Sequence, residues 1–403
     1  CTGMPGSLPV LNKKVVEYAA AVGLATNCTI TQDCKFDRKN YFYPDNPQNY
    51  QISQHYLPIC RNGHVDVKLE DGTEKSIRIH EIHMEEDAGK LIHDEWEGVS
   101  FVDFNRSGVP LIEIVSEPDM RSAEEVIAYL TKLRNIIQYL GASDCKLQEG
   151  SMRADVNLSV RERGSSEFGT RTETKNLNSF AAIERAIKAE TARQIDIIEA
   201  GDKVVQETRR WNDDKEYSYA MRSKEDAQDY RYFPDPDLVP IHISDEWLEQ
   251  LKAKQPEFKE EKMKRYKEEF GIPDYDINMI TDCKKLADIF EATTAICNKP
   301  KKVSNWLIAE TMRILKEKEM DPEDITFKPE SLAKIIELAD AGTINSNAAK
   351  QVFEAIFDED IDVDRYVEEK GLKQVNDEGA LKATVEKVIA ENPQSVADYK
   401  AGK

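Results

Sequence analysis

Residues 110–141 read PLIEIVSEPDMRSAEEVIAYLTKLRNIIQYLG, and two kinds of regular pattern follow each other within this stretch. Its first six residues, apolar except for one glutamate, indicate a buried β-strand. Ser122 and Glu125 then form the S-x-x-E pattern of a helix N-terminus, and Gly141 is a residue type that ends helices. Between them, apolar side chains recur at the spacing of one helix face: Val126, Leu130, Leu133, Ile137 and Leu140. The stretch predicts a strand followed by an amphipathic helix.

Further strand signals lie on both sides of this unit. Apolar residues alternate with polar ones before and after Asp71-Gly72, which is typical of a β-hairpin. The same alternation over residues 152–160 predicts a strand with Met152, Ala154, Val156, Leu158 and Val160 on one face. A second amphipathic helix is expected from about Phe180 to Gly201. Hairpins interrupted by long helices favour an α+β domain over a strict alternation of strand and helix.

The strand signals stop after Asp235-Pro236-Asp237 and Pro240, because proline disrupts helices and strand ladders alike. Helical patterns replace them at residues 247–270, 285–290, 303–314, 332–338 and 348–357. We therefore predict that the second half is all-helical and forms two small bundles.

Composition excludes several classes of protein. The 403 residues carry a net charge of −21, which argues against a non-specific binder of polyanions. One basic cluster stands out, and it is either a solvated helix face or a local binding surface: Lys299, Lys301, Lys302, Arg313, Lys316 and Lys318. Seven irregularly spaced cysteines indicate reduced thiols, and we expect a cytoplasmic protein without a membrane span. Because the chain begins with Cys1, we expect a fragment of a longer protein.

Two acidic segments are candidates for catalysis. No P-loop or dinucleotide fingerprint occurs, so any ATP must be held in another way. Glu113 lies between two isoleucines of the expected strand, where a carboxylate must be paired across strands, protonated or metal-bound. Residues 83–90, HMEEDAGK, contain three consecutive acids, which are either solvated or ligands of Mg²⁺. If Glu86 and Glu113 lie at the ends of neighbouring strands, together they could hold a metal that neutralises a transferring phosphoryl group.

Two further segments combine polar and aromatic residues. Residues 35–45, KFDRKNYFYPD, alternate cations with aromatic side chains, and the alternative is a surface loop packed by its own tyrosines. Residues 149–155, EGSMRAD, add a polar strand face with a glycine that permits close approach of the backbone.

These segments resemble, in their order, those of the tRNA-dependent amidotransferase B-subunit family. The similar stretches are KFDRKNYFYPDNPQNYQISQ (35–54), HMEEDAGK (83–90), DFNRSGVPLIEIVSEPD (103–119), EGSMRADVNLSV (149–160), TKNLNSF (174–180) and DYRYFPDPDLVP (229–240). They cover most of the first 240 residues. From about Leu332 onward, the chain is similar to the small helical tail of that family.

The resemblance implies a cradle-shaped catalytic domain like that of glutamine synthetase and guanidino kinases at residues 1–243. A helical domain at 244–330 and a tail domain at 331–403 would follow. Members of this family work with two partners, the glutaminase (A) subunit and the small (C) subunit. They use ATP to phosphorylate the side-chain carboxylate of glutamate or aspartate misacylated onto tRNA(Gln) or tRNA(Asn). Ammonia channelled from the glutaminase then displaces the phosphate.

The resemblance also implies roles for individual residues. Glu86 and Glu113 would hold Mg²⁺, and Lys39 would pair with one of them and help to gate ammonia. A second group would line the ammonia channel or contact phosphates: Tyr41, Arg106, Arg153 and Asp155. We expect Lys301 and Lys302 to contact the tRNA.

The chain departs from the family pattern at both ends. Family members begin with an I-G-L-E-V-H segment, whose His and Glu help to bind the metal, and this segment is not in the sequence. Cys1 matches the last ligand of a four-cysteine zinc site whose other ligands would lie upstream. The chain also stops before the last helices of the tail.

Two alternatives stay open at this point. A non-catalytic tRNA-binding scaffold of the same fold would not need acids beside apolar strands. The archaeal, glutamate-specific relative carries an inserted domain, for which no block of sequence exists between residues 200 and 330.

Overall fold

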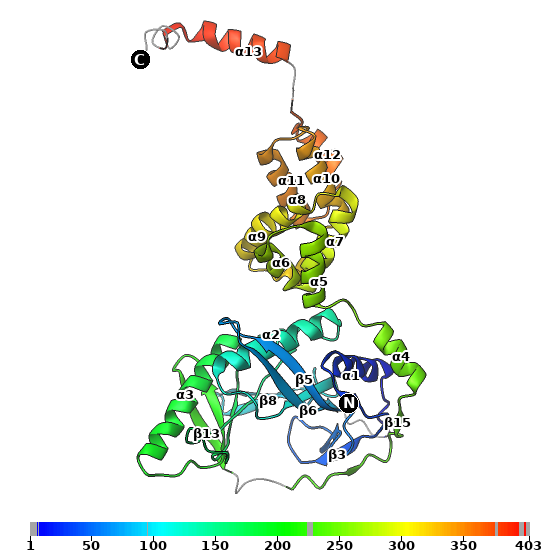
Figure 1. The fold of residues 1–403 in the computed structure, drawn as a ribbon, viewed down its shortest axis with the longest axis vertical. Helices are drawn as coiled ribbons and strands as arrows, with labels where there is room; N and C mark the ends of the chain where they lie inside the picture. The colour runs from blue at the N-terminus through cyan, green and yellow to red at the C-terminus, as the bar shows by residue number, and fades with distance from the viewer. Residues whose placement is uncertain are drawn as a thin grey trace. The chain divides into compact units, whose positions relative to one another are not determined.

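The computed structural model describes residues 6, 8–94, 96–223, 229–374, 378–394 and 399 (Figure 1). The chain forms two compact units, Cys1–Phe258 and Lys259–Lys403. The first contains helices and sheets, and the described part of the second contains helices only, so the α+β fold class is confirmed. Among the described helices, none combines the length and hydropathy needed to cross a bilayer.

The main sheet of the first unit has the strand order β1-β5-β6-β9, with all neighbours antiparallel. Its strands are β1 (Thr29–Ile30), β5 (Cys60–Lys68), β6 (Glu74–Glu86) and β9 (Pro110–Ser116). The predicted hairpin is confirmed, because β5 and β6 are joined by a turn in which Gly72 has a φ of +87°. Since β9 lies at the edge of the sheet, one of its long sides has no strand neighbour among the described residues.

Two helices pack against this sheet, α1 (Lys13–Ala25) and α2 (Ala123–Tyr139). The prediction of α2 is confirmed: the Ser122 hydroxyl accepts a hydrogen bond from the Glu125 N–H, and Gly141 follows the helix with a φ of +67°. The core beneath them contains Val65, Val67, Ile77 and Ile79 from the hairpin. One face of α2 contributes to this core, and the other contacts α3.

A second sheet has the order β10-β11-β12-β13. Its strands are β10 (Val156–Leu158), β11 (Thr172–Lys175), β12 (Glu207–Asn212) and β13 (Tyr217–Ser223). The predicted helix α3 (Phe180–Glu199) is confirmed and connects the one parallel pair, β11 and β12. The predicted strand over residues 152–160 is wrong in extent, because only Val156–Leu158 find a partner strand, β11.

Short strands join segments that are far apart in the sequence. β3 (Asp37–Asn40) lies between β4 (Tyr50–Ser53) and β14 (Phe233–Pro234), so residues 229–240 return beside residues 35–45. β2 (Asp33–Cys34) pairs with β15 (Ile241–His242), and β7 (Lys90–Asp94) pairs with β8 (Val99–Asp103). β15 corrects the expectation that strands end before Pro240: its two residues pair across a long sequence separation, which no local pattern reveals.

The second unit consists of helices around one core. They are α5 (Lys259–Arg265), α6 (Asp274–Thr281), α7 (Lys284–Cys297), α8 (Pro300–Asn305), α9 (Met312–Lys318), α10 (Pro329–Asp340), α11 (Ser346–Asp358) and α12 (Val363–Glu369). The last helix, α13 (Glu378–Glu391), adds no described residue to this core. Two π-helical segments, η2 (Tyr266–Phe270) and η3 (Trp306–Thr311), extend α5 and α8, and η4 (Pro322–Asp324) is a 3₁₀ turn. Four of the five predicted helical stretches are confirmed, at residues 285–290, 303–314, 332–338 and 348–357. The fifth, predicted as one stretch over residues 247–270, is wrong at its centre, because residues 254–258 are not helical and separate α4 (Asp245–Ala253) of the first unit from α5.

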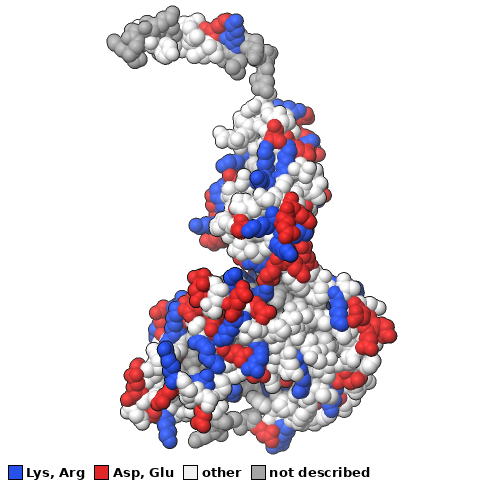
Figure 2. Space-filling view, in the orientation of Figure 1, with Lys and Arg blue, Asp and Glu red and all other residues white. Residues whose placement is uncertain are grey.

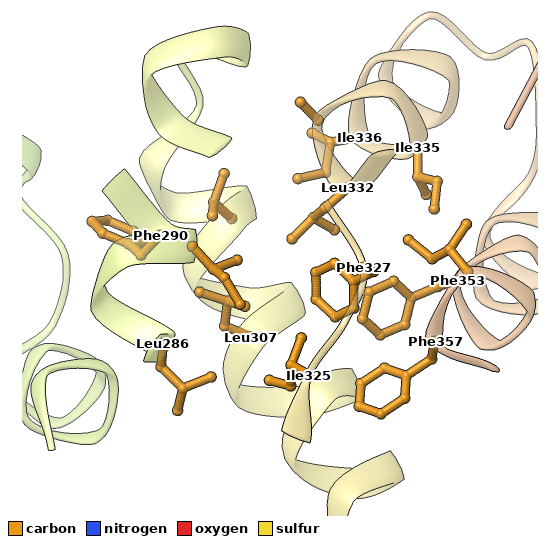
Figure 3. Packing of buried hydrophobic residues seen from close by; sticks show 14 of the residues in the cluster. Leu286, Phe290, Leu307, Ile325, Phe327, Leu332, Ile335, Ile336, Phe353 and Phe357 are labelled. Carbon is orange, nitrogen blue, oxygen red and sulfur yellow. The ribbon is translucent and has the colours of Figure 1, made fainter. Parts of the chain in front are cut away.

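The core of the second unit is continuous across residue 330. Figure 3 shows Phe290 and Leu307 on one side of Phe327 and Leu332, and Phe353 on the other. The helices on both sides of residue 330 therefore share one hydrophobic cluster. In the first unit, α4 (Asp245–Ala253) packs against α1, so the compact units divide after Phe258. The domain limits at residues 243 and 330 stay predictions.

Candidate active site

Three side chains with metal-ligand chemistry meet on one face of the main sheet. His83 on β6 lies directly opposite Glu113 on β9, and Glu85 is two residues further along β6 on the same face. One ligand atom from each of these residues lies within 4.8 Å of the others. The His83 Nε2 atom is 3.6 Å from the Glu113 carboxylate and 3.7 Å from the Glu85 carboxylate. We refer to His83, Glu85 and Glu113 as the acidic cluster.

The charges within the acidic cluster are strongly coupled. Burial lowers the pKa of His83, but the neighbouring carboxylates of Glu81, Glu85 and Glu113 outweigh this effect and raise it to about 9. Burial also raises the pKa of Glu113, against the effect of His83. Carboxylates held this close repel each other. A bound cation would relieve this repulsion, and one imidazole nitrogen with two carboxylates suits a divalent ion such as Mg²⁺ or Mn²⁺.

Glu113 is less buried than its apolar neighbours imply. Because β9 is an edge strand, the Glu113 side chain retains 53% of its accessible surface and faces a cavity. Its closest cationic partner is His83 on the neighbouring strand, as in the cross-strand pairing that the sequence left open.

The expected pairing of Glu86 with Glu113 is corrected by the strand register. Glu86 lies opposite Pro110, and a step of one residue from Glu85 turns its side chain to the other face of β6. There its carboxylate accepts hydrogen bonds from the Gln48 side-chain amide (2.8 Å) and the Ile52 backbone N–H (3.4 Å). The structure thus brings Glu85, rather than Glu86, together with Glu113.

Lys39 on β3 lies near the acidic cluster and lines the same cavity. Within the described residues it makes no ion pair with a carboxylate. Its ammonium group lies 4.9 Å from the ring centroid of Tyr230 and 6.0 Å from that of Tyr41. Tyr41 is a neutral phenol at neutral pH, since burial and the nearby charges of Asp45 and Glu85 raise its pKa to about 12.

Arg106 and Arg153 share one buried carboxylate, that of Asp87. Arg106 donates to it through Nε (3.1 Å) and Arg153 through Nη2 (2.6 Å). Arg106 also donates to the Gly150 carbonyl oxygen at 2.7 Å. Gly150 has a φ of +72°, a backbone conformation that other residues rarely adopt, so the shape of this turn depends on glycine. Two guanidinium groups on one carboxylate leave a net positive charge at the cavity wall.

Asp155 forms an ion pair of 2.5 Å with Lys175 on β11. Burial lowers the pKa of Lys175, but Asp155 and Glu173 outweigh burial and raise it. Both partners line the cavity, so Asp155 is engaged with a cation from the second sheet.

Most of the residues of this site line one cavity of about 2360 Å³. They are Lys39, Glu85, Asp87, Arg106, Glu113, Arg153, Asp155 and Lys175. The cavity wall carries nine Lys or Arg and eight Asp or Glu side chains. The chain as a whole has a net charge of −21, whereas the charges of the cavity wall nearly cancel. The acidic excess of the protein therefore lies outside the cavity. A space that combines a candidate cation site with nine cationic side chains suits a large anionic substrate.

Comparison with known proteins identifies the family of the chain. Residues 1–249 match the family described as GatB/GatE catalytic domain, and residues 288–403 match the GatB domain family. Relatives along the whole chain are each named as the B subunit of aspartyl/glutamyl-tRNA(Asn/Gln) amidotransferase. Those of Lachnospira eligens, Agathobacter rectalis and Lachnoclostridium phytofermentans are 83%, 72% and 65% identical to this chain over its whole length. The matches cover 85%, 85% and 84% of the length of these relatives.

The chain belongs to the GatB/GatE family. The resemblance inferred from its sequence motifs is thereby confirmed. Cys1, the residue matched to a zinc ligand in that family, lies outside the described residues.

The basic cluster of the GatB-type helical unit is largely neutralised. Lys299 and Lys302 both pair with Asp340, and Lys318 pairs with Asp358. Arg313 pairs with three glutamates, Glu310, Glu317 and Glu354. Figure 2 shows blue and red side chains interleaved over the visible face of this unit. Of the two residues expected to contact tRNA, Lys301 alone has no ion pair within the described part of the chain.

Sequence reasoning missed two members of the acidic cluster, His83 and Glu85. Both stand in the segment HMEEDAGK, and the period of two in a strand places His83 and Glu85 on one face and Met84 and Glu86 on the other. Met84 is buried in the core, which assigns Glu86 to the core-facing side. The alternation of Met84 with its neighbours was therefore the signal that could have identified Glu85.

Proposed function

We propose that the acidic cluster is the phosphoryl-transfer site of this chain. As a GatB-type protein, the chain is the B subunit of an ATP-dependent amidotransferase that converts Glu-tRNA(Gln) or Asp-tRNA(Asn) to the amidated form with glutamine as amide donor. The proposed step is phosphorylation of the side-chain carboxylate of the tRNA-bound amino acid. The observation that carries the proposal is the convergence of His83, Glu85 and Glu113 at a cavity that is also lined by nine cationic side chains.

The chemistry explains why such a site is needed. A carboxylate does not react with ammonia because oxide is a very poor leaving group, and an acyl phosphate provides a good one. Phosphoryl transfer demands positioning and neutralisation of charge more than a protein nucleophile. A divalent cation at the acidic cluster would supply that neutralisation when bound.

The surrounding residues have proposed roles that follow from their contacts. Arg153 has one ion-pair partner in the described chain, Asp87, and its half-exposed side chain is available to contact a phosphate. Arg106 holds Asp87 and the Gly150 loop, so it positions Arg153 rather than contacting phosphate itself. Lys39, close to Tyr41 and Glu113, is placed to bind the carboxylate undergoing activation or to control the entry of ammonia.

The remaining proposals concern assembly and fold. We propose that the first unit is a cradle of the glutamine synthetase and guanidino kinase type. The partners would be the glutaminase (A) subunit, which delivers ammonia, and the small (C) subunit. Cys1 would complete a structural zinc site together with ligands from outside this sequence. Because misacylated tRNA is made where translation occurs, the bacterial cytoplasm is the proposed location.

The proposal is tested by the phosphorylated intermediate. With Glu-tRNA(Gln) and γ-labelled ATP, but no ammonia donor, the assembled enzyme should transfer label to the aminoacyl group. Glu113→Ala should lower this transfer on the order of a thousandfold, because the cation site loses a ligand. Glutamine hydrolysis should stay unchanged, and Glu70→Ala, in an exposed turn of the same unit, is the matched control.

Two results would contradict the proposal. Normal transfer by Glu113→Ala would remove the role of the acidic cluster. A wild-type enzyme that binds the tRNA and transfers no label would support a scaffold of the same fold.

A further inference from the structure

Four arginines at one end of the cavity form no ion pair with a carboxylate in the described part of the chain. They are Arg121, Arg161, Arg163 and Arg171, and all four line the cavity wall. By contrast, four of the five other cavity cations have acidic partners: Arg106, Arg153, Lys175 and Lys188. We refer to the four unpaired arginines, together with Phe168, as the arginine end.

Backbone contacts hold two of these guanidinium groups without neutralising their charge. Arg121 donates to the carbonyl oxygens of Pro118 (2.6 Å) and Met120 (2.9 Å). Arg161 donates to the Ser166 carbonyl oxygen at 3.0 Å. The connection from β10 to β11 also contains Glu162 and Glu167, which make no ion pair in the described structure. A third acid, Asp119, has its pKa lowered by Arg78 and to a smaller extent by Arg121, but it already forms an ion pair with Arg78. The four arginines therefore leave the arginine end positive.

An exposed aromatic ring lies between two of the arginines. Phe168 retains 56% of its accessible surface, and the guanidinium carbons of Arg161 and Arg121 lie 4.8 Å and 5.9 Å from its ring centroid. The neighbouring Gly169 permits this fold of the loop, because a Cβ atom there would lie 2.0 Å from the Val160 carbonyl oxygen. The loop is thus packed against its own strand and presents an aromatic face beside cations.

Two chain segments connect the arginine end with the acidic cluster. One leads from Glu113 along β9 to Arg121, and the other from Asp155 along β10 to Arg161. At their starting points the two segments are close, because the charge of Asp155 acts on Glu113. At their far points they are close again, because Arg121 and Arg161 both contact the ring of Phe168. Asp155 and Arg161 are so close in sequence that the distance between them is at most about 20 Å.

We propose that the arginine end binds the single-stranded 3′ end of the aminoacylated tRNA. The arginines contact its phosphates, and Phe168 stacks on one of its bases. Proteins that bind single-stranded nucleic acid combine cations along the backbone path with aromatic side chains that stack on bases. With its strand anchored there, the aminoacyl group extends along β9 and β10 to the acidic cluster. The inference rests on the proposed function, since it names the part of the substrate that the same cavity holds.

The arrangement favours RNA over the triphosphate of ATP. The phosphate to be transferred must lie at the acidic cluster, where Arg153 and Lys39 are the nearby cations. A second cationic end with its own aromatic ring matches a ligand that has both phosphates and bases along its length. The 3′ end of tRNA is such a ligand, and it must reach the cluster for the reaction to occur.

The test compares Michaelis constants in the assembled amidotransferase. The double variant Arg163→Gln/Arg171→Gln should raise the KM for Glu-tRNA(Gln) about tenfold, and Phe168→Ala should raise it to a similar extent. The KM for ATP and the hydrolysis of glutamine should stay at wild-type values. The dependence of log KM on log salt concentration should also become shallower in the double variant, by about one unit. Lys215→Gln removes an exposed cation outside the cavity of the same unit and is the matched control.

Two outcomes would overturn the inference. Unchanged KM for tRNA in both variants would show that the arginine end does not bind the acceptor strand. A raised KM for ATP with unchanged KM for tRNA would assign these arginines to the nucleotide. If the wild-type enzyme formed no phosphorylated aminoacyl-tRNA at all, the proposed function itself would fail, which the same assay distinguishes.

Discussion

Most side chains of the basic cluster in the helical unit have acidic partners, whereas four arginines at one end of the cavity in the first unit form no ion pair within the described residues. Lys299, Lys302 and Lys318 each pair with an aspartate of α10 or α11. Arg163 and Arg171, by contrast, have no carboxylate within ion-pairing distance in the described chain. A charge that is covered without a partner loses solvation energy, and a bound anion would neutralise it. Several arginines without partners in one cavity therefore favour binding of an anion there.

The difference between the two regions also explains the charge of −21 in a protein that acts on tRNA. Recognition of a folded RNA depends on local contacts and shape rather than on the total charge of the protein. The cavity wall is locally balanced, with nine cations and eight acids, while acids elsewhere neutralise the cations of the helical unit. We therefore expect substitutions in the cavity to change substrate binding, and substitutions in the helical core to change stability.

The largest effect on stability should come from that core. Phe353 is fully buried and contacts the rings of Trp306, Phe327 and Phe357. Phe353→Ala should lower the free energy of opening of α10 and α11 by about 3–5 kcal/mol, because it removes buried apolar contacts and leaves a cavity. Hydrogen exchange measured element by element would report this change.

The same measurement supplies its controls. Amides of β5 and β6 in the first unit should exchange as in the wild type, and Tyr275→Ala, which removes an exposed ring from α6, should leave α10 and α11 unchanged. Equal loss of protection in both units would contradict the division into two separately stabilised units.

A smaller effect is expected from the two lysines proposed to contact tRNA. Lys301→Glu/Lys302→Glu should raise the KM for tRNA only a few-fold, less than the arginine-end variants, because Asp340 already neutralises much of the Lys302 charge. Asp340→Asn, which releases Lys299 and Lys302, should lower that KM slightly. An effect of the lysine variant larger than that of Arg163→Gln/Arg171→Gln would reverse the comparison.

Local patterns were sufficient to predict much of the fold. The cap at Ser122, the spacing of apolar residues and Gly141 define α2, and Asp71-Gly72 defines the β5–β6 hairpin. Each of these signals acts between residues close in sequence, so it depends little on the contacts of distant segments. The motifs of the first 240 residues likewise led to the correct family.

The details of the site depended on information that local patterns do not contain. The register of β6 against β9 decides which acid of the segment HMEEDAGK lies beside Glu113. A shift of one residue in this register would place Glu86 there instead of Glu85. The half-exposed position of Glu113 follows from the place of β9 at the sheet edge. Similarly, Asp340 lies far in sequence from Lys302, so the neutral character of the basic cluster could not be foreseen.

The proposed catalysis depends on the cation site formed by His83, Glu85 and Glu113, and binding of Mn²⁺ tests it most directly. Titration of the full chain, followed by the electron paramagnetic resonance of free Mn²⁺, should show about tenfold or greater loss of affinity in Glu85→Gln and in Glu113→Gln. Glu86→Gln, the adjacent acid on the other face of β6, should bind Mn²⁺ like the wild type. Wild-type affinity in Glu85→Gln, or a loss in Glu86→Gln as large as that in Glu113→Gln, would contradict a cation site at these three residues.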